Sequence, residues 1–214
     1  MPAPQTPDRQ ASPDAASGRG AERATDLAAA VGAERPVDFG ADLLRRALEA
    51  GASDAALLRP DQVVTAEWVR WKCLYGCPVS GRCLTCPPHS PAPEETRRLL
   101  NEYETILLLR FDVHPERAEW LRSAPWVLRT ALALERELFL AGHHKAFAIA
   151  GGRSCDLPEA CGSPETCASR EGLRPGLAGC GIDVFGTSAG AGWALAVVAA
   201  EGEPYHRYAL ILVN

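Results

Sequence analysis

Four of the eight cysteines in this chain lie within fourteen consecutive positions, from 73 to 86. A second and looser group of four follows between positions 155 and 180. Thiols at this density can bind a metal ion or an iron–sulfur cluster, act as a redox dithiol, or form disulfides. Each group alone contains enough sulfur for a four-cysteine site. The first group is Cys73, Cys77, Cys83 and Cys86, and the second is Cys155, Cys161, Cys167 and Cys180.

The cellular compartment decides how these thiols are interpreted. The N-terminal residues MPAPQTPDRQ lack the basic-then-apolar pattern of a secretory signal. The longest uncharged run, 184–200, is rich in Gly and Ala and too short to span a membrane. We therefore expect a cytoplasmic protein with reduced thiols, in which metal binding or redox chemistry is a better explanation than disulfides. The net charge of −5, without a basic stripe, argues against nucleic acid and membrane surfaces as partners.

Zinc and iron–sulfur clusters both accept four cysteines, and three details favour an iron–sulfur cluster such as 4Fe–4S. Cys77 and Cys86 are each followed by proline, as is the last cysteine of bacterial ferredoxin motifs. The spacings lack two matched C-x2-C knuckles. Lys72, beside Cys73, would offset part of the negative charge of the thiolates. A redox-active cluster would pass electrons to a protein partner or sense oxidants. The alternative is a zinc-stabilised binding module without redox activity.

Three other chemistries fit the residues less well. Cys83 and Cys86 have the spacing of a thioredoxin-type dithiol, but prolines follow where a helix should begin. Gly186–Gly190 has the pattern G-x-S-x-G, yet too little chain follows it to build a hydrolase. A metal acting as a Lewis acid needs an open coordination position, for which Asp183 and His89 are the nearest candidates. No reaction is therefore assigned.

Hydrophobic patterns predict the elements that position both cysteine groups. Apolar runs and alternation predict strands over 63–73, 105–113, 145–152 and 208–213. Helical periodicity with capping and stop residues predicts helices over 38–51, 93–100, 125–142 and 187–200. Both cysteine groups then follow a strand, in loops broken by Pro and Gly.

This order of elements indicates an α+β fold, or an irregular α/β sandwich, because strands and helices mix without strict alternation. We expect a small mixed sheet with flanking helices and two Cys-rich loops. Residues 1–36 are polar and proline-rich without apolar periodicity, which predicts a disordered tail. Residues 37–214 are then a single cysteine-rich metal-binding domain.

The combined motifs resemble those of a family known as domain of unknown function 2284. They are KC-x2-GC-x8-CPP, then LERELFLAGHHKAFAIAGG, then RP-x4-CGIDVF, and the resemblance covers roughly residues 63–193. Members are described as predicted metal-binding proteins. The resemblance therefore implies metal binding and implies no particular reaction.

Two departures from the family pattern concern the ligand set. In the family the first loop carries cysteines that match Cys73, Cys77 and Cys86, so that Cys83 is an addition here. Pro158 stands where the second loop of the family has another cysteine. The second group can therefore form its own site, or share one site with the first group.

Overall fold

The computed structural model describes residues 38–78, 80–113, 117–150, 165, 167, 172–200 and 202–214, with side chains described from 123 onward in the segment that begins at 117. The tail predicted for 1–36 lies outside this part of the chain, as do Cys155 and Cys161. None of the helices within it has the length and apolar character needed to cross a lipid bilayer.

One sheet organises the fold, and its four strands are β1 (Asp54–Leu58), β2 (Ile106–Val113), β3 (Phe147–Ala150) and β4 (Tyr205–Leu212). The strands lie in the order β1-β2-β4-β3, and all three pairings are antiparallel. Leu212 of β4 pairs with Ile106 on one side and with Phe147 on the other. The predicted α+β class is confirmed, whereas the sheet is antiparallel rather than mixed.

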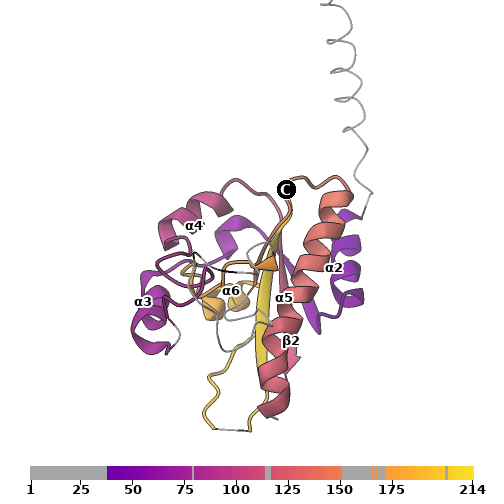
Figure 1. Cartoon of the computed structure of the whole chain (residues 1–214). Helices are drawn as coiled ribbons and strands as arrows, with labels where there is room; N and C mark the ends of the chain where they lie inside the picture. Colours follow the sequence, from indigo (N-terminus) through magenta and orange to yellow (C-terminus); the bar gives the residue numbers. More distant parts are fainter. Residues whose placement is uncertain are drawn as a thin grey trace, which may run out of the picture. The chain divides into compact units, whose positions relative to one another are not determined.

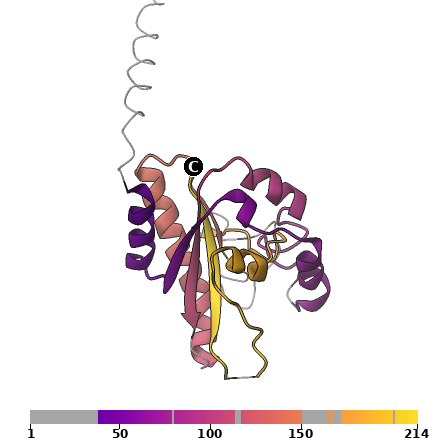
Figure 2. The same cartoon turned by 180° about the vertical axis from the view of Figure 1, so that it is seen from behind.

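Five helices flank this sheet in the described chain, with a short 3-10 turn, η1 (Pro60–Gln62), after β1. They are α2 (Phe39–Glu49), α3 (Glu67–Gly76), α4 (Pro93–Leu100), α5 (Arg117–Leu140) and α6 (Val184–Gly190). Figures 1 and 2 show α2 and α5 on one side of the sheet and α3, α4 and α6 on the other. The molecule therefore has two different layers on a common sheet.

Strand alternation builds a separate core on each face of the sheet. From β2, Leu107, Leu109 and Phe111 join the core under α2 and α5. Ile106 and Leu108 point the opposite way, into the second core. That second core contains no residue of α2 or α5 and includes three residues from the end of the cysteine region, namely Leu177, Cys180 and Ile182.

Several predicted elements are confirmed together with their end signals. Asp38 caps α2, because its carboxylate accepts a hydrogen bond from the amide of Ala41 at 3.2 Å. Gly51 follows the helix with φ +108°, a left-handed conformation that glycine adopts without strain. Pro93 occupies the first turn of α4, where its missing N–H costs no hydrogen bond. The strands predicted around β2, β3 and β4 are also present.

The strand predicted over 63–73 is wrong, because most of this segment forms α3. Only the residues before Glu67 are extended, and Thr65 forms an isolated antiparallel bridge with Ile182. The apparent alternation arose from a helix with a small inward face, on which Val69 is buried and Cys73 half-buried one turn later. Cys73 therefore lies within a helix rather than at the end of a strand.

Two helix boundaries differ from prediction, and one strand was not predicted. The helix predicted from Pro125 begins at Arg117, and Pro125 lies inside it. The helix predicted over 187–200 is α6 alone, which ends at Gly190 with a turn through Gly192 at φ +77°. Strand β1 was not predicted, since its sequence DAALL is rich in alanine and has little β propensity. Pairing with the apolar β2 outweighs that weak local preference.

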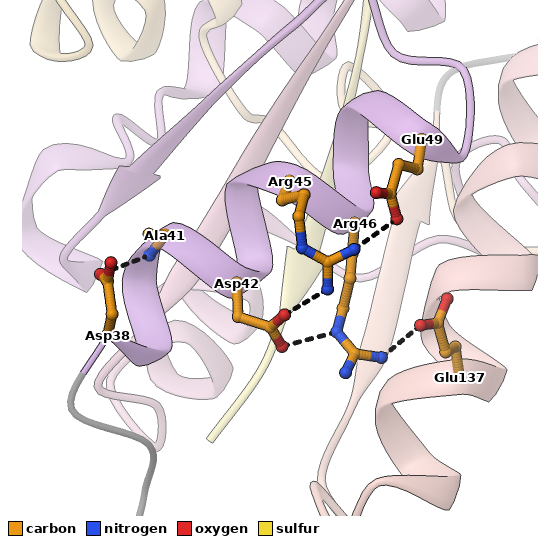
Figure 3. A network of polar contacts seen from close by, with 7 residues as sticks. All are labelled: Asp38, Ala41, Asp42, Arg45, Arg46, Glu49 and Glu137. Carbon is orange, nitrogen blue, oxygen red and sulfur yellow. Dashed lines mark hydrogen bonds and ion pairs between the residues drawn. The ribbon is translucent and has the colours of Figure 1, made fainter.

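Figure 3 shows the polar contacts along α2, one of which reaches Glu137 of α5. Asp42 accepts hydrogen bonds from Arg45 and Arg46, and these guanidiniums lower the pKa of the Asp42 carboxyl. Arg46 also pairs with Glu137 of α5, which links the two helices on this side of the sheet. The contacts are exposed, so the buried residues Leu43 and Ala47 anchor the helix more strongly than these ion pairs do.

The cap of α2 supplies the first testable prediction. Replacing Asp38 with Ala leaves the Ala41 amide without its acceptor and should lower the free energy of unfolding by about 1 kcal/mol. Glu49→Ala is the matched control, because it removes an exposed ion pair with Arg45 at the other end of the same helix. Urea unfolding followed by tryptophan fluorescence measures both. Equal effects of the two variants would contradict the capping role.

Candidate metal centre

The first cysteine group is carried by the end of α3 and the turns after it. Cys73 lies in the last turn of α3, and Cys77 is the residue that ends the helix in an extended conformation. Cys83 and Cys86 follow in a turn closed by a 3.0 Å hydrogen bond from the Cys86 amide to the Cys83 carbonyl. Both are buried, whereas Cys73 and Cys77 are half-buried.

The turn after Cys86 is also tightly bonded. The Cys86 carbonyl accepts hydrogen bonds from the amides of His89 and Ser90, at 2.9 and 3.0 Å. The peptide bond between Pro87 and Pro88 is cis. The two hydrogen bonds to the Cys86 carbonyl fix the direction in which the chain leaves Cys86 and enters α4.

Cys180 lies on the same side of the sheet as this loop. Its side chain is 1% exposed and belongs to the second core, against β2 and β4. The residues after it pair with the segment that leads into α3: the Ala66 amide donates to the Gly181 carbonyl at 2.8 Å, and the Asp183 amide donates to the Val64 carbonyl at 2.8 Å. Asp183 then caps α6, because its carboxylate accepts from the Phe185 amide.

The Cys180 segment and the Cys86 loop contact each other directly. The Ser90 hydroxyl donates to the Gly179 carbonyl at 2.8 Å, and the buried Thr96 hydroxyl of α4 donates to the Cys180 carbonyl at 2.8 Å. A β-carbon on Gly179 would lie 2.7 Å from the Thr85 carbonyl oxygen, so only glycine permits this approach. We call the segments 66–92 and 176–183 together the cysteine layer.

The side chain of Arg70 joins α3 to the turn after Cys86 and to Gly179. Nη1 of Arg70, on α3, donates to the carbonyls of Pro91, Gly179 and Ser90 at 2.7, 3.2 and 3.3 Å. Arg70 precedes Cys73 by three positions on the helix, so both lie on neighbouring parts of its surface. The charged guanidinium thus ties the helix of Cys73 to the residues beside Cys86 and Cys180.

The thiols of this layer influence one another electrostatically. Burial raises the pKa of Cys73, and the nearby Cys86 and Cys77 raise that pKa further, while Arg70 opposes the shift. Burial raises the pKa of Cys180 to about 12, against smaller opposing effects of Thr96 and Arg70. Because a ligating sulfur must lose its proton, a metal held by these thiols would displace protons, and its binding would strengthen as the pH rises.

The comparison with known protein families supports metal binding in general. The profile of a family described as predicted metal-binding protein (DUF2284) matches residues 56–213, well over half of the chain. This chain belongs to the DUF2284 family. No curated protein and no solved structure matches it.

The DUF2284 match includes all eight cysteines, of which the structure describes six. The structure places the Cys180 segment against the loop of the first group, although the sequence position of Cys180 assigned it to the second group. Cys167 is half-buried, and Cys155 and Cys161 lie outside the described residues, so the second site stays a prediction. Within the described ranges no three His, Cys, Asp or Glu side chains lie close enough together to hold one ion. Sulfur-only donors nevertheless suit a metal that prefers thiolates, such as zinc or iron.

Three residues of this DUF2284 protein were missed by sequence reasoning. Arg70, Ser90 and Thr96 form the polar bonds that assemble the cysteine layer. Thr96 carried a usable sequence signal, since it lies on the apolar side of an amphipathic helix. In the structure it is 1% exposed. Arg70 carried a weaker one, its spacing of three from Cys73. Nothing local marks either of them as a partner of the distant residues 179 and 180.

Proposed function

We propose that this protein binds a metal through cysteine thiolates and that the bound group is an iron–sulfur cluster. The observation that supports this most is the assembly of three cysteine-bearing segments on one face of the sheet, with Cys83, Cys86 and Cys180 buried there. Cys73, Cys77, Cys83 and Cys86 are the first ligand candidates, and Cys180 of the second group follows Gly179, which is hydrogen-bonded to Ser90 and Arg70.

Iron–sulfur is favoured over zinc by the sequence around these thiols. Cys77 and Cys86 each precede a proline, and the irregular spacings do not form paired zinc knuckles. Positive charge near a thiolate-rich cluster is also expected. The Lys72 ammonium lies over the Trp68 ring, 4.8 Å from its centre, and Arg70 is hydrogen-bonded to the assembled segments.

The role that we propose is electron transfer to a protein partner, or sensing of oxidants, in the cytoplasm. Helix α3 supports a protein partner, because Trp71 and Tyr75 are 62% and 85% exposed beside Cys73. Exposed aromatic side chains of this kind are typical of surfaces that other proteins cover. The alternative function is a zinc-stabilised binding module without redox activity.

The deciding experiment is anaerobic purification followed by a visible spectrum and metal analysis of one sample. A brown protein that contains iron and acid-labile sulfide supports the cluster. A colourless protein with stoichiometric zinc, which unfolds when the zinc is chelated, supports the alternative. A protein that retains neither metal overturns the proposal.

Cys86 supplies the ligand test. Cys86→Ser should remove most of the bound metal, because a hydroxyl is a much poorer ligand than a thiolate for iron or zinc. Metal content and visible absorbance are measured beside the urea midpoint of the metal-free protein, which should match that of metal-free wild type. Unchanged metal content would exclude Cys86 as a ligand.

A further inference from the structure

We propose that Arg70 is a positioning residue for the candidate metal ligands, holding the segments that carry Cys73, Cys86 and Cys180 against one another. This inference rests on the proposed function and goes beyond it, because it names a residue that is not a ligand. Neither the cysteine motifs nor the family description points to an arginine.

The geometry of Arg70 suits this role. A single nitrogen, Nη1, lies within 3.3 Å of three carbonyl oxygens, two from the turn after Cys86 and one from Gly179, directly before Cys180. These carbonyls come from segments about ninety positions apart in the chain, as residues 90 and 179 show. A charged donor bonds carbonyls more strongly than a neutral one does. Removing the guanidinium would therefore remove these links between α3 and both segments.

The charge of Arg70 has a second consequence. In the described part of the chain, Arg70 forms no salt bridge with a carboxylate, and its hydrogen bonds there are all to backbone carbonyls. Its positive charge lies beside the segments of Cys73, Cys86 and Cys180, where it would offset part of the negative charge of a thiolate-rich cluster.

Arg97 provides a matched control within the same protein. It lies on α4, is also half-buried, and likewise donates to backbone carbonyls, those of Pro60 at 2.8 Å and Val63. Its described hydrogen bonds reach neither the Cys86 loop nor the Cys180 segment. Arg97→Gln thus removes a comparable set of hydrogen bonds from an arginine to backbone carbonyls, without removing a bond to the Cys86 loop or the Cys180 segment.

The experiment compares wild type, Arg70→Gln, Arg70→Lys and Arg97→Gln, each purified anaerobically with its bound metal. Loss of metal to an excess of chelator is followed over time, and the unfolding midpoint of each metal-free variant is recorded. Supporting groups around metal ligands typically change metal affinity by about 10- to 100-fold. Arg70→Gln should therefore lose metal at least about tenfold faster than wild type and Arg97→Gln, with Arg70→Lys between them.

A second readout separates charge from mere support. In the fraction that retains iron, Arg70→Gln should have a more negative midpoint potential than wild type, because a lost positive charge favours the oxidised cluster. Arg70→Lys, which keeps the charge, should restore most of the potential. If Arg70→Gln loses metal no faster than Arg97→Gln, the inference is overturned while the proposed function stands. A wild-type protein without metal overturns both.

Discussion

Replacing Glu135 with Ala should lower the free energy of unfolding by about 3 kcal/mol, because it removes the carboxylate of a half-buried ion pair with Arg174. Glu135 on α5 and Arg174 are only 14% and 18% exposed, and they form a two-pronged ion pair, with Arg174 Nε 2.7 Å from Glu135 Oε2. The same carboxylate accepts a hydrogen bond from the Ala148 amide at 2.6 Å. Its loss therefore removes the acceptor that the Ala148 amide shares with the Arg174 guanidinium.

The ion pair between Glu135 and Arg174 also affects the edge of the sheet at β3. Arg174 immediately precedes Pro175, whose carbonyl accepts from the Ala150 amide on β3 at 3.1 Å. Together Glu135 and Pro175 cover the outer edge of β3, which would otherwise offer unpaired amides to another chain. The chain then continues to Leu177 and Cys180. We expect Glu135→Ala to loosen the approach to the cysteine layer as well as the sheet edge.

Glu137→Ala is the control for this prediction. Glu137 lies two positions later on the same helix, is 48% exposed and pairs with Arg46 on the surface. Its removal should cost less than about 1 kcal/mol, as exposed ion pairs usually do. Urea unfolding of both variants measures the difference. If Glu135→Ala is no more destabilised than Glu137→Ala, the ion pair with Arg174 is not the anchor that we describe.

Replacing Gly181 with Ala should destabilise the protein by a similar amount and also weaken metal binding. Gly181 has φ +72°, and a β-carbon there would lie 2.5 Å from Cγ of Pro93. The left-handed backbone costs an alanine about 1–2 kcal/mol, and overpacking adds about 1–3 kcal/mol. Relief of the clash would push the Cys180 segment away from α4, which begins at Pro93.

Gly192→Ala separates backbone strain from the clash. Gly192 has nearly the same φ, +77°, but nothing lies within 4 Å of its β-carbon position. This control should cost only the backbone term of about 1–2 kcal/mol and leave metal content unchanged. Urea unfolding and metal analysis are made on both variants. Equal losses of stability, with metal retained in Gly181→Ala, would show that the contact with Pro93 does not position Cys180.

Local signals in the sequence predicted the elements that have clear ends. Asp38 and Gly51 bounded a helix because capping and left-handed turns are properties of single residues. The apolar run of β2 needed no context, since a strand buried on both faces reads as continuous hydrophobicity. Where the signal was only alternation, as in 63–73, prediction failed, because the short inward face of α3 mimics a strand over a few residues.

For the candidate site, too, some features follow from the sequence and others only from the tertiary structure. The sequence by itself determined which residues have metal-binding chemistry, because clustered thiols in turns rich in Pro and Gly are recognisable from type and spacing. It also indicated the α+β class and the family. Only the tertiary structure decided that Cys180 lies against the loop of Cys86 and that Arg70 joins them. Those contacts connect residues about ninety positions apart, and they depend on sheet pairing and buried hydrogen bonds that no local pattern contains.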